Sequence, residues 1–464
     1  MWPWNGVRGF IVLFGAGGML MAAEAARAVA VTDIPGLVRV SNRDVMVAST
    51  EIESAENEIK IARARYLPNI ELKSTYTRLD KDVVLDIPSQ RIEKQILNGS
   101  VTIGLDVDPP PVEIQKKDMM MSNLVLTQPL FTGGRITAGL DAAEAGLNIA
   151  RAEAEQTYRE RLAESLIRYF QVQLAGDVLT TLRKIELELN NIAATAEAAV
   201  KTGAVAKFAT MQIKVAQVDL SARIKEAEAS QKLATLAFKD SIGFDAMQTA
   251  SFDSPLLKVD MKHGLDVFKT KALSERTEFK ILDAKGTQVA ALKSAKAGEM
   301  LPTMFLFGTY NVARENLPIF TPKWAAGVGL NVPITAGLTQ VPEMRRAAQL
   351  AAKVEILRAK ARAQIPLQVE QLFDHCQALR GALETLEANQ GLAAEVQRLA
   401  EARFKAGTGS AVEVLKANAD NQTAQVRRLM LLEEYNRHLI ELFQASGSVD
   451  YYVASYQDAQ KSRG

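Results

Sequence analysis

The sequence predicts a mainly α-helical protein with a small β part, written as two copies of one structural unit. Three observations favour this fold class. Proline and glycine markers recur at a fixed spacing, long proline-free stretches carry helical apolar stripes, and four short segments alternate apolar and polar residues. A fixed spacing of this kind is the sequence sign of a repeated architecture.

The repeat keeps one register over most of the chain. Pairs that lie 204 residues apart are Pro129 and Pro333, Gly133 and Gly337, Gly203 and Gly407, and Gly243 and Gly447. Upstream, Leu67-Pro68 and Leu301-Pro302 lie 234 residues apart, as do similar triplets beginning at Asn42 and Arg276. A register that shifts once by 30 predicts an internal structural duplication with one insertion, placed between Pro68 and Pro129.

Composition favours long helices and gives no sign of a nucleic-acid partner. The formal net charge is +1, charged residues make up 23% of the chain, and aromatic residues make up 6%. A balanced charge offers nucleic acid little electrostatic attraction. With Cys376 as its one cysteine, the chain has no internal disulfide and no cysteine-built zinc site.

Residues 1–30 are interpreted as a signal peptide. A positive charge precedes a short apolar run from Phe10 to Met21, and small residues precede a predicted cut between Ala30 and Val31. An uncleaved membrane anchor is the alternative. No later stretch of 18 apolar residues occurs, so we expect an exported protein that is soluble or crosses a membrane as strands.

The proline-free stretches predict two long helical hairpins packed as coiled coils. From Thr132 to Thr202, apolar residues recur at three- and four-residue steps over about 70 residues, which as helix would span about 105 Å. The second half repeats this pattern. Pro366 lies inside it and is expected to kink its helix near Gln364, whereas its first-half counterpart is Leu162.

Glycines mark the predicted ends of these helices. Gly203 and Gly407 each follow a basic last turn, which is typical of a helix C-terminus with a left-handed cap. Because a new helical pattern begins within a few residues, each glycine is interpreted as the tip of an antiparallel hairpin. Gly243 and Gly447 are expected to close the returning helices.

Alternation predicts four strands, two in each half. The patterns cover Ile70–Tyr76, Met304–Val312 and Trp324–Val332, with a weaker match at Leu124–Leu126. The loop between the first two strands is the longer one, in line with the insertion. It contains Pro109-Pro110-Pro111, which cannot continue a ladder, and Lys116-Lys117, so we expect it to be exposed.

These elements divide the chain into five segments. They are the signal peptide (1–30), a first repeat (31–243) with a β-hairpin over about 68–129, a linker (244–263), a second repeat (264–447) with a β-hairpin over about 302–333, and a C-terminal tail (448–464).

A bilayer would force such chains to assemble. Strands of about ten residues can cross it at a tilt, but a four-stranded sheet leaves two edges whose backbone groups find no partner in hydrocarbon. Outer-membrane barrels have at least eight strands. Three copies would give a twelve-stranded barrel, and their twelve antiparallel helices could form a tube continuous with it. The alternative is a flat sheet in a soluble protein.

The ordered motifs resemble the outer-membrane efflux proteins, the TolC-like family. The resemblance rests on Leu67-Pro68, the run from Gln128 to Arg135, its repeat from Trp324 to Pro333, and the run from Ala402 to Leu415. It covers roughly residues 40 to 453. It implies a homotrimer in the outer membrane of a Gram-negative bacterium, with a twelve-stranded β-barrel continuous with a long periplasmic α-helical barrel.

The resemblance also implies a function and partners. The trimer would be the passive exit duct of a tripartite efflux or type I secretion system, docked on a periplasmic adaptor (membrane fusion) protein and an inner-membrane RND or ABC transporter. Gly203 and Gly407 would mark the docking tips. Helix–strand junctions would lie at Pro68, Pro129, Gly133, Gly134, Pro302, Pro333 and Gly337, where glycine permits a positive φ.

One part of the family pattern is altered. Family members often place two acidic residues three apart just after the tip glycine, as rings that constrict the entrance. Glu413 matches the first position, but Lys416 takes the second, so cation selectivity does not follow. A solvated glutamate at a helix start is the alternative for Glu413. Phe404 and Gly409 replace the residues that form the closing latch in the best-known members, so no such latch is expected.

No catalytic, cofactor or metal site is predicted, and the chain is expected not to be an enzyme. His375-Cys376 is interpreted as a packing pair, and His263 and His438 as isolated residues. The alternative to a duct is a periplasmic coiled-coil adaptor of an export system, which normally carries one hairpin flanked by β-rich modules. The cargo is left open, because ducts of this family serve drug, metal or protein export.

Overall fold

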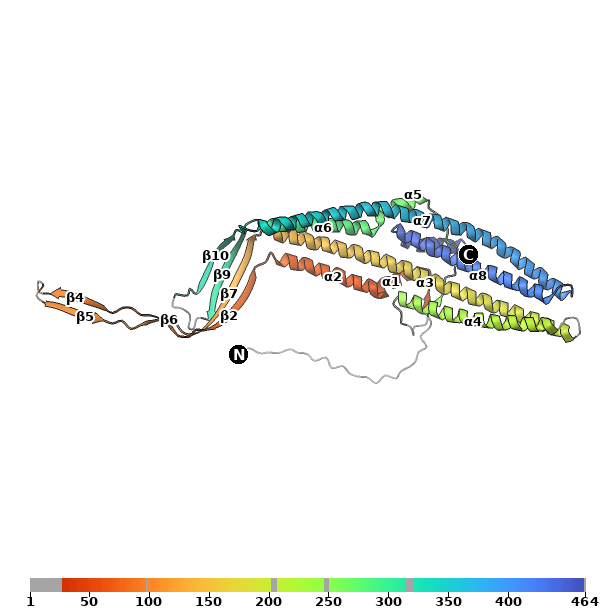
Figure 1. Cartoon of the computed structure of the whole chain (residues 1–464), viewed down its shortest axis with the longest axis horizontal. Coiled ribbons are helices and arrows are strands. Elements are labelled where there is room, and N and C mark those ends of the chain that lie inside the picture. The colour runs from red at the N-terminus through yellow and green to blue at the C-terminus, as the bar shows by residue number, and fades with distance from the viewer. Residues whose placement is uncertain are drawn as a thin grey trace, which may run out of the picture.

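The computed structural model describes residues 27–96, 99, 101–201, 207–245, 250–313 and 320–462. Gly203, the first predicted tip, and most of the predicted signal peptide lie outside these ranges. The molecule is elongated, with long helices that lead into a small sheet at one end (Figure 1). No helix in the described ranges is both long and apolar enough to cross a membrane.

Two runs of elements follow the same order along the chain. The first is α2 (Arg43–Ala64), β2 (Asn69–Arg78), β7 (Asp118–Phe131), α3 (Arg135–Lys201) and α4 (Lys207–Ser241). The second is α6 (Thr277–Gly298), β9 (Thr303–Ala313), β10 (Trp324–Asn331), α7 (Gly337–Lys405) and α8 (Ala411–Ala445). Short helices α1 (Ile34–Ser41) and α5 (Leu265–Glu275) precede the two runs. All four predicted strands are confirmed.

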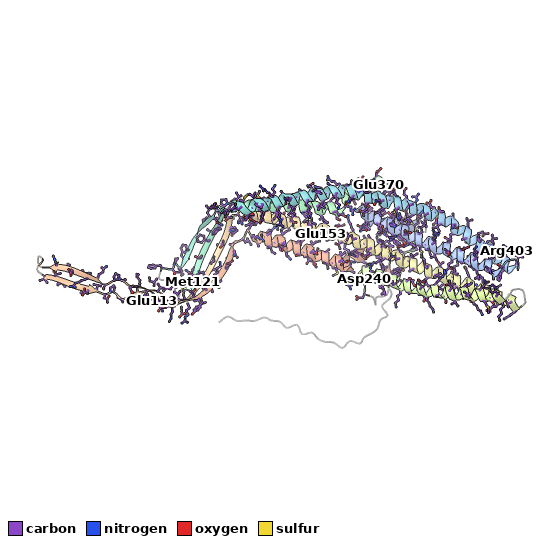
Figure 2. The ribbon with its side chains drawn as sticks, viewed as in Figure 1. Glu113, Met121, Glu153, Asp240, Glu370 and Arg403 are labelled. Atoms are coloured by element: carbon purple, nitrogen blue, oxygen red, sulfur yellow. The ribbon has the colours of Figure 1, made fainter. Side chains whose placement is uncertain are left out.

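The two longest helices determine the length of the molecule. α3 has 67 residues and α7 has 69, and at 1.5 Å per residue each spans about 100 Å. α7 runs without a break through Pro366, and it bends near Glu370 (Figure 2). Proline removes one backbone hydrogen bond and crowds the preceding turn, so a bend here is in line with the expected kink.

Gly243 and Gly447 close α4 and α8, as predicted. Their φ angles are +74° and +72°. After each glycine, the next backbone N–H donates to a carbonyl five residues back, at 2.9 Å from Phe244 and 2.8 Å from Ser448. A Cβ at Gly243 would overlap the carbonyl of Ser41, the last residue of α1, and one at Gly447 would crowd the backbone where α5 meets α6.

The sheet has four antiparallel strands in the order β10-β9-β7-β2. The long loop expected between the first two strands is instead mostly paired: β3 (Val83–Leu85) pairs with β6 (Val112–Gln115), and β4 (Gln90–Ile96) with β5 (Val101–Val107). These ladders extend away from the sheet (Figure 1). The three prolines separate β5 from β6, so they interrupt the pairing only locally.

The main core surrounds the middle of the helices. The segment predicted as a linker contributes buried Leu256, Leu257 and Val259 to it. The predicted C-terminal tail is a helix, α9 (Asp450–Lys461), that buries Tyr452 and Tyr456. Two tyrosine hydroxyls, those of Tyr456 and Tyr435, donate hydrogen bonds to backbone carbonyls of the segment before α5. Tyr435, for example, donates to the carbonyl of Val259 at 2.7 Å.

A strand upstream of the predicted cut belongs to this core. Strand β1 (Arg27–Val29) pairs in parallel with β8 (Ala250–Phe252). Val29 is fully buried, and its carbonyl accepts a hydrogen bond from the Tyr169 hydroxyl at 3.1 Å. Cleavage between Ala30 and Val31 would remove this strand. The position of the cut stays a prediction.

Candidate functional site

The four-stranded sheet carries one continuous apolar face. In the observed register Leu72 lies opposite Leu124, Leu124 opposite Tyr310, and Tyr310 opposite Trp324, which makes a row across all four strands. Residues directly opposite each other share a face of the sheet. All four side chains are exposed in the single chain. Neighbouring rows add Ile70, Leu306, Val328 and Leu330, also exposed.

The opposite face of the sheet has a different chemistry. On β2 it carries Glu71 and Lys73, whose side chains form an ion pair at 3.1 Å. On β10 it carries Gly327 and Gly329, where the rings of Phe307 and Phe305 cover the space that a Cβ would occupy. The sheet is therefore apolar on one face and mixed, with charges and small residues, on the other.

Both outer strands of the sheet have an open edge. Among the described residues, β2 pairs only with β7 and β10 only with β9. Such an edge presents a row of unpaired N–H and C=O groups that another strand can satisfy. β2 has ten residues and β10 has eight, so these edges are long.

The predicted junction residues lie between helices and strands, with two corrections. Pro68 and Pro302 directly precede β2 and β9, and Pro333 lies between β10 and α7. Pro129 is not at a strand end but inside β7, at a register shift against β9. Gly337 begins α7 without the expected positive φ, because it occupies an ordinary helical position.

Gly133 and Gly134 do have positive φ, at +63° and +80°. Gly133 also makes a close contact that sequence reasoning missed. A Cβ on Gly133 would overlap the carbonyl of Gly298, and a Cβ on Gly298 would overlap that of Gly133. The end of α6 and the start of α3 therefore meet backbone to backbone. The position of Gly298 just before Leu301-Pro302 is the signal that could have indicated it.

The tip of the second hairpin is built by Gly407. Its φ is +74°, and its N–H donates to the carbonyl of Phe404 while Thr408 N–H donates to that of Arg403, both at 3.0 Å. This pattern is a Schellman cap. Ser410 then caps α8, because its hydroxyl accepts a hydrogen bond from Glu413 N–H at 3.2 Å.

Glu413 and Lys416 are both exposed on the first turns of α8. The Glu413 carboxylate lies 3.6 Å from the Arg403 guanidinium on α7, near the labelled tip in Figure 2. Sequence reasoning missed this partner, which adds a second cation beside the one glutamate. Phe404 packs against the apolar cluster between the two hairpins, together with Val414.

A match to a family model assigns the chain to a protein family. The model described as outer membrane efflux protein matches residues 34–243 and 313–448, which is well over half of the chain. The chain belongs to the outer membrane efflux protein family. Efflux channels of the outer membrane are thus its relatives, and the family consists of channels rather than enzymes. A sequence comparison with curated proteins gives no match.

Solved structures share the fold of this efflux protein. The Campylobacter jejuni CmeC outer membrane channel matches with a TM-score of 0.71 at 14% identity, over 94% of this chain and 90% of that one. The Vibrio cholerae outer membrane protein VceC matches with 0.68 at 14%, over 90% and 96%. The open state of the Neisseria gonorrhoeae MtrE outer membrane channel matches with 0.70 at 16%, over 90% and 89%.

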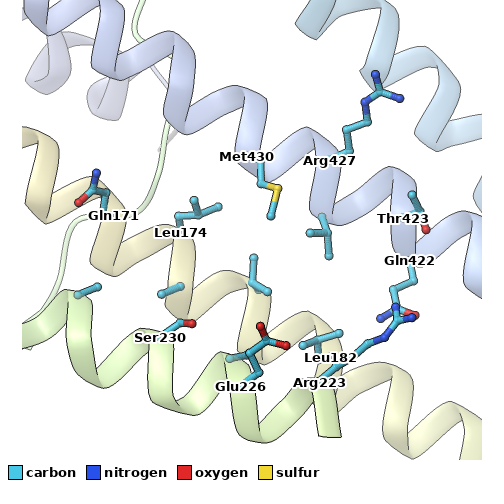
Figure 3. A pocket seen from close by; sticks show the side chains of 15 residues that line it. Gln171, Leu174, Leu182, Arg223, Glu226, Ser230, Gln422, Thr423, Arg427 and Met430 are labelled. Atoms are coloured by element: carbon cyan, nitrogen blue, oxygen red, sulfur yellow. The ribbon is translucent and has the colours of Figure 1, made fainter. Parts of the chain in front are cut away.

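A cavity of about 720 Å³ separates the two helical hairpins of the efflux protein. Side chains from α3, α4 and α8 line it (Figure 3). Leu174, Val178 and Met430 give it an apolar wall, and Arg223 and Glu226 lie on its α4 side. No sequence pattern indicates this cavity, because the α8 residues that line it lie far along the chain from those of α3 and α4.

The structure corrects the interpretation of one histidine. His438 is not isolated, since its ring centre lies 4.3 Å from that of His375 across α7 and α8. Burial lowers the pKa of His438, with Arg437 and His375 acting in the same direction against Glu441. Cys376 is fully buried, as expected of a packing residue, and burial raises its pKa to about 12, so its thiol is inert at neutral pH.

Proposed function

We propose that three copies of this efflux protein close into a twelve-stranded barrel in the outer membrane of a Gram-negative bacterium. The observation that carries the proposal is the apolar row across a four-stranded sheet with two open edges. Lipid would cover the apolar face, and β2 of one copy would pair with β10 of the next. No backbone group would then remain unpaired in hydrocarbon.

The helices extend this barrel into a tunnel. α3 and α7 each span about 100 Å, and both connect to the sheet through tight junctions at Gly133-Gly134 and Pro333. The three protomers would bring together twelve helical segments around one axis. We propose that this tube lies in the periplasm and that the duct is passive, with energy supplied by a pump.

The partners belong to the same proposal. We place a periplasmic adaptor (membrane fusion) protein at the hairpin tips, near Gly203 and Gly407, and an inner-membrane RND or ABC transporter beyond it. We assign the chain to a tripartite efflux or type I secretion system. The family match supports an outer-membrane channel over the alternative of a periplasmic adaptor, since the matched family is described as outer membrane efflux protein.

A reconstitution experiment tests the duct. Purified from the outer-membrane fraction in detergent, the protein should elute as a trimer and form single channels in a planar bilayer. The same protein recovered as a monomer from a detergent-free periplasmic extract, with no channel activity, would overturn the proposal.

A large side chain at Gly407 tests whether the adaptor docks at the tip of the second hairpin. Gly407→Trp should abolish export that depends on the adaptor and leave trimers intact. Gly407→Ala is the matched control, because it carries the same backbone strain at φ +74° without the bulk. Docking at this tip is ruled out if Gly407→Trp exports as well as Gly407→Ala.

Charge-removing substitutions test whether Glu413 and Lys416 line the entrance of the channel. We infer that Glu413, Lys416 and Arg403 together leave the entrance without strong cation selectivity, because each glutamate has two cations nearby. Lys416→Gln should raise the preference for cations, and Glu413→Gln should shift it toward anions, both measured as reversal potentials in a salt gradient. Unchanged reversal potentials in both variants would show that these residues do not line the constriction.

A further inference from the structure

Three side chains of the kinds that ligate metals meet between α7 and α8, at a place to which the proposed duct gives no role. His375 lies on α7, while Glu434 and His438 lie one turn apart on α8 and so share a face of that helix. One ligand atom of each residue lies within 4.8 Å of those of the other two. Two of the three histidines of the chain are thus brought together.

The orientation of His438 suits a metal ligand. Its Nδ1 lies 2.9 Å from Oε2 of Glu441, one turn further along α8, although the approach is not aligned as a hydrogen bond. Metal-binding imidazoles commonly donate the N–H of their second nitrogen to a carboxylate, and Glu441 is within reach for that bond once the ring turns to align it. Nε2 of His438 is then the atom left for a ligand bond.

The guanidinium of Arg437 lies beside two of the three side chains, His438 and Glu434. A guanidinium nitrogen of Arg437 lies 3.2 Å from His438 Nε2. The same side chain lies 3.9 Å from Glu434 Oε1 and 3.8 Å from Glu441 Oε1. Positive charge is therefore favoured here. Arg437 is partly exposed, so its side chain can swing out and make room for an ion.

We propose that His375, Glu434 and His438 bind a divalent transition-metal ion of the zinc type, which clips α7 to α8. Two imidazoles and one carboxylate are a ligand set found around zinc, and they leave the fourth position to water. In a tetrahedral zinc site the ligand atoms lie about 3.3 Å apart. His375 is exposed, so its side chain can rotate and bring its ligand atom from within 4.8 Å of the other two to the shorter spacing of a zinc site.

The site would act as a structural clip rather than a catalytic centre. His375 lies 59 positions before Glu434, on the other arm of the second hairpin. An ion held by both arms binds only when they are packed, so it stabilises the folded hairpin. The inference does not depend on the duct, because metal binding is measured on the protein without any transport assay.

The test uses the whole purified protein in detergent, with a histidine-free tag and after treatment with a chelator. Titration with Zn²⁺ should give one ion per chain and raise the melting temperature, and Co²⁺ should give the visible absorption of a tetrahedral site. His375→Ala and His438→Ala should each weaken Zn²⁺ binding at least about tenfold. Glu441→Gln, which alters a positioning residue, should weaken it less.

His263→Ala is the matched control, because it removes the third histidine, which faces Phe268 elsewhere in the fold. It should bind Zn²⁺ as the unchanged protein does. Elution of every variant as the same species shows that the fold is kept. The proposal is overturned if Zn²⁺ at micromolar concentration neither binds nor shifts melting, or if His375→Ala and His438→Ala bind as tightly as His263→Ala.

Discussion

At the scale of single residues, glycines control where backbones can meet. Gly133 combines a positive φ with a backbone contact to Gly298, whereas Gly134 has a positive φ and open space at its Cβ position. Gly337 has open space at its Cβ position and no positive φ. Comparing these three glycines therefore distinguishes the cost of a left-handed backbone from the cost of a steric overlap. The glycine pattern in the sequence does not distinguish the two costs.

Alanine substitutions at these glycines should give a graded loss of stability. Gly134→Ala should cost about 1–2 kcal/mol for its left-handed backbone, and Gly133→Ala should cost more because the carbonyl of Gly298 must also move. Gly337→Ala should be neutral or slightly stabilising. Thermal unfolding of the detergent-solubilised protein measures the series. A Gly133→Ala variant as stable as Gly337→Ala would contradict the backbone contact.

A half-buried carboxyl, that of Asp177, predicts how stability responds to pH. Burial raises the pKa of Asp177 on α3 above its ordinary value of 3.8. The folded state therefore binds the proton more tightly than the unfolded state does. As pH rises above the pKa of the unfolded state and then above the raised pKa of the folded state, stability falls, because the folded protein must then hold a charged carboxylate in a partly buried place. Asp177→Asn should melt higher than the unchanged protein at neutral pH, and the difference should vanish below about pH 3.8. A lower melting point of Asp177→Asn at neutral pH would contradict a destabilising burial of this carboxylate.

Residue contacts across the fold were the part that the sequence could not indicate. The histidine cluster and the Arg403–Glu413 pair join α7 to α8. Periodicity along one helix says which face is apolar, but it does not say which residue of another helix lies opposite. Gly298 was missed for the same reason, since its partner Gly133 is in the other half of the chain.

At the scale of elements, local patterns were sufficient for the long helices and the sheet. Alternation located β2, β9 and β10, and glycine caps located the ends of α4, α7 and α8. The pairing of β4 with β5 was missed because Pro109-Pro110-Pro111 favours a loop, although these prolines lie beyond the end of β5. The helical C-terminus was missed because Tyr452 and Tyr456 show their spacing only over one short turn.

Adjacent residues of β9 test which face of the sheet meets lipid. Tyr310 belongs to the apolar row and Thr309 lies on the opposite face. A lysine on the lipid face of a barrel costs about 2–4 kcal/mol near the bilayer midplane. Tyr310→Lys should therefore reduce the amount of folded protein in the outer membrane, while Thr309→Lys should not. Equal yields in outer-membrane fractions would contradict the assignment of the faces.

At the scale of the whole molecule, the four-stranded sheet of the single chain is open at both edges and exposed on its apolar face. The family to which the chain belongs forms outer-membrane channels. Each of the two runs of elements contains a strand pair and a helical hairpin. Closure by neighbouring copies would satisfy the edges and the apolar face together, which is why the trimer is the central claim.

Disulfide trapping between protomers tests this claim most directly. Thr75→Cys on β2 would be combined with a scan of single cysteines along β10, and Cys376 would not interfere because it is buried. We predict that at least one pairing yields covalent trimers under mild oxidation in cells, while each single-cysteine variant stays uncrosslinked at these strands. If no β10 position cross-links to Thr75→Cys, and the protein remains monomeric in the membrane, the shared wall is contradicted.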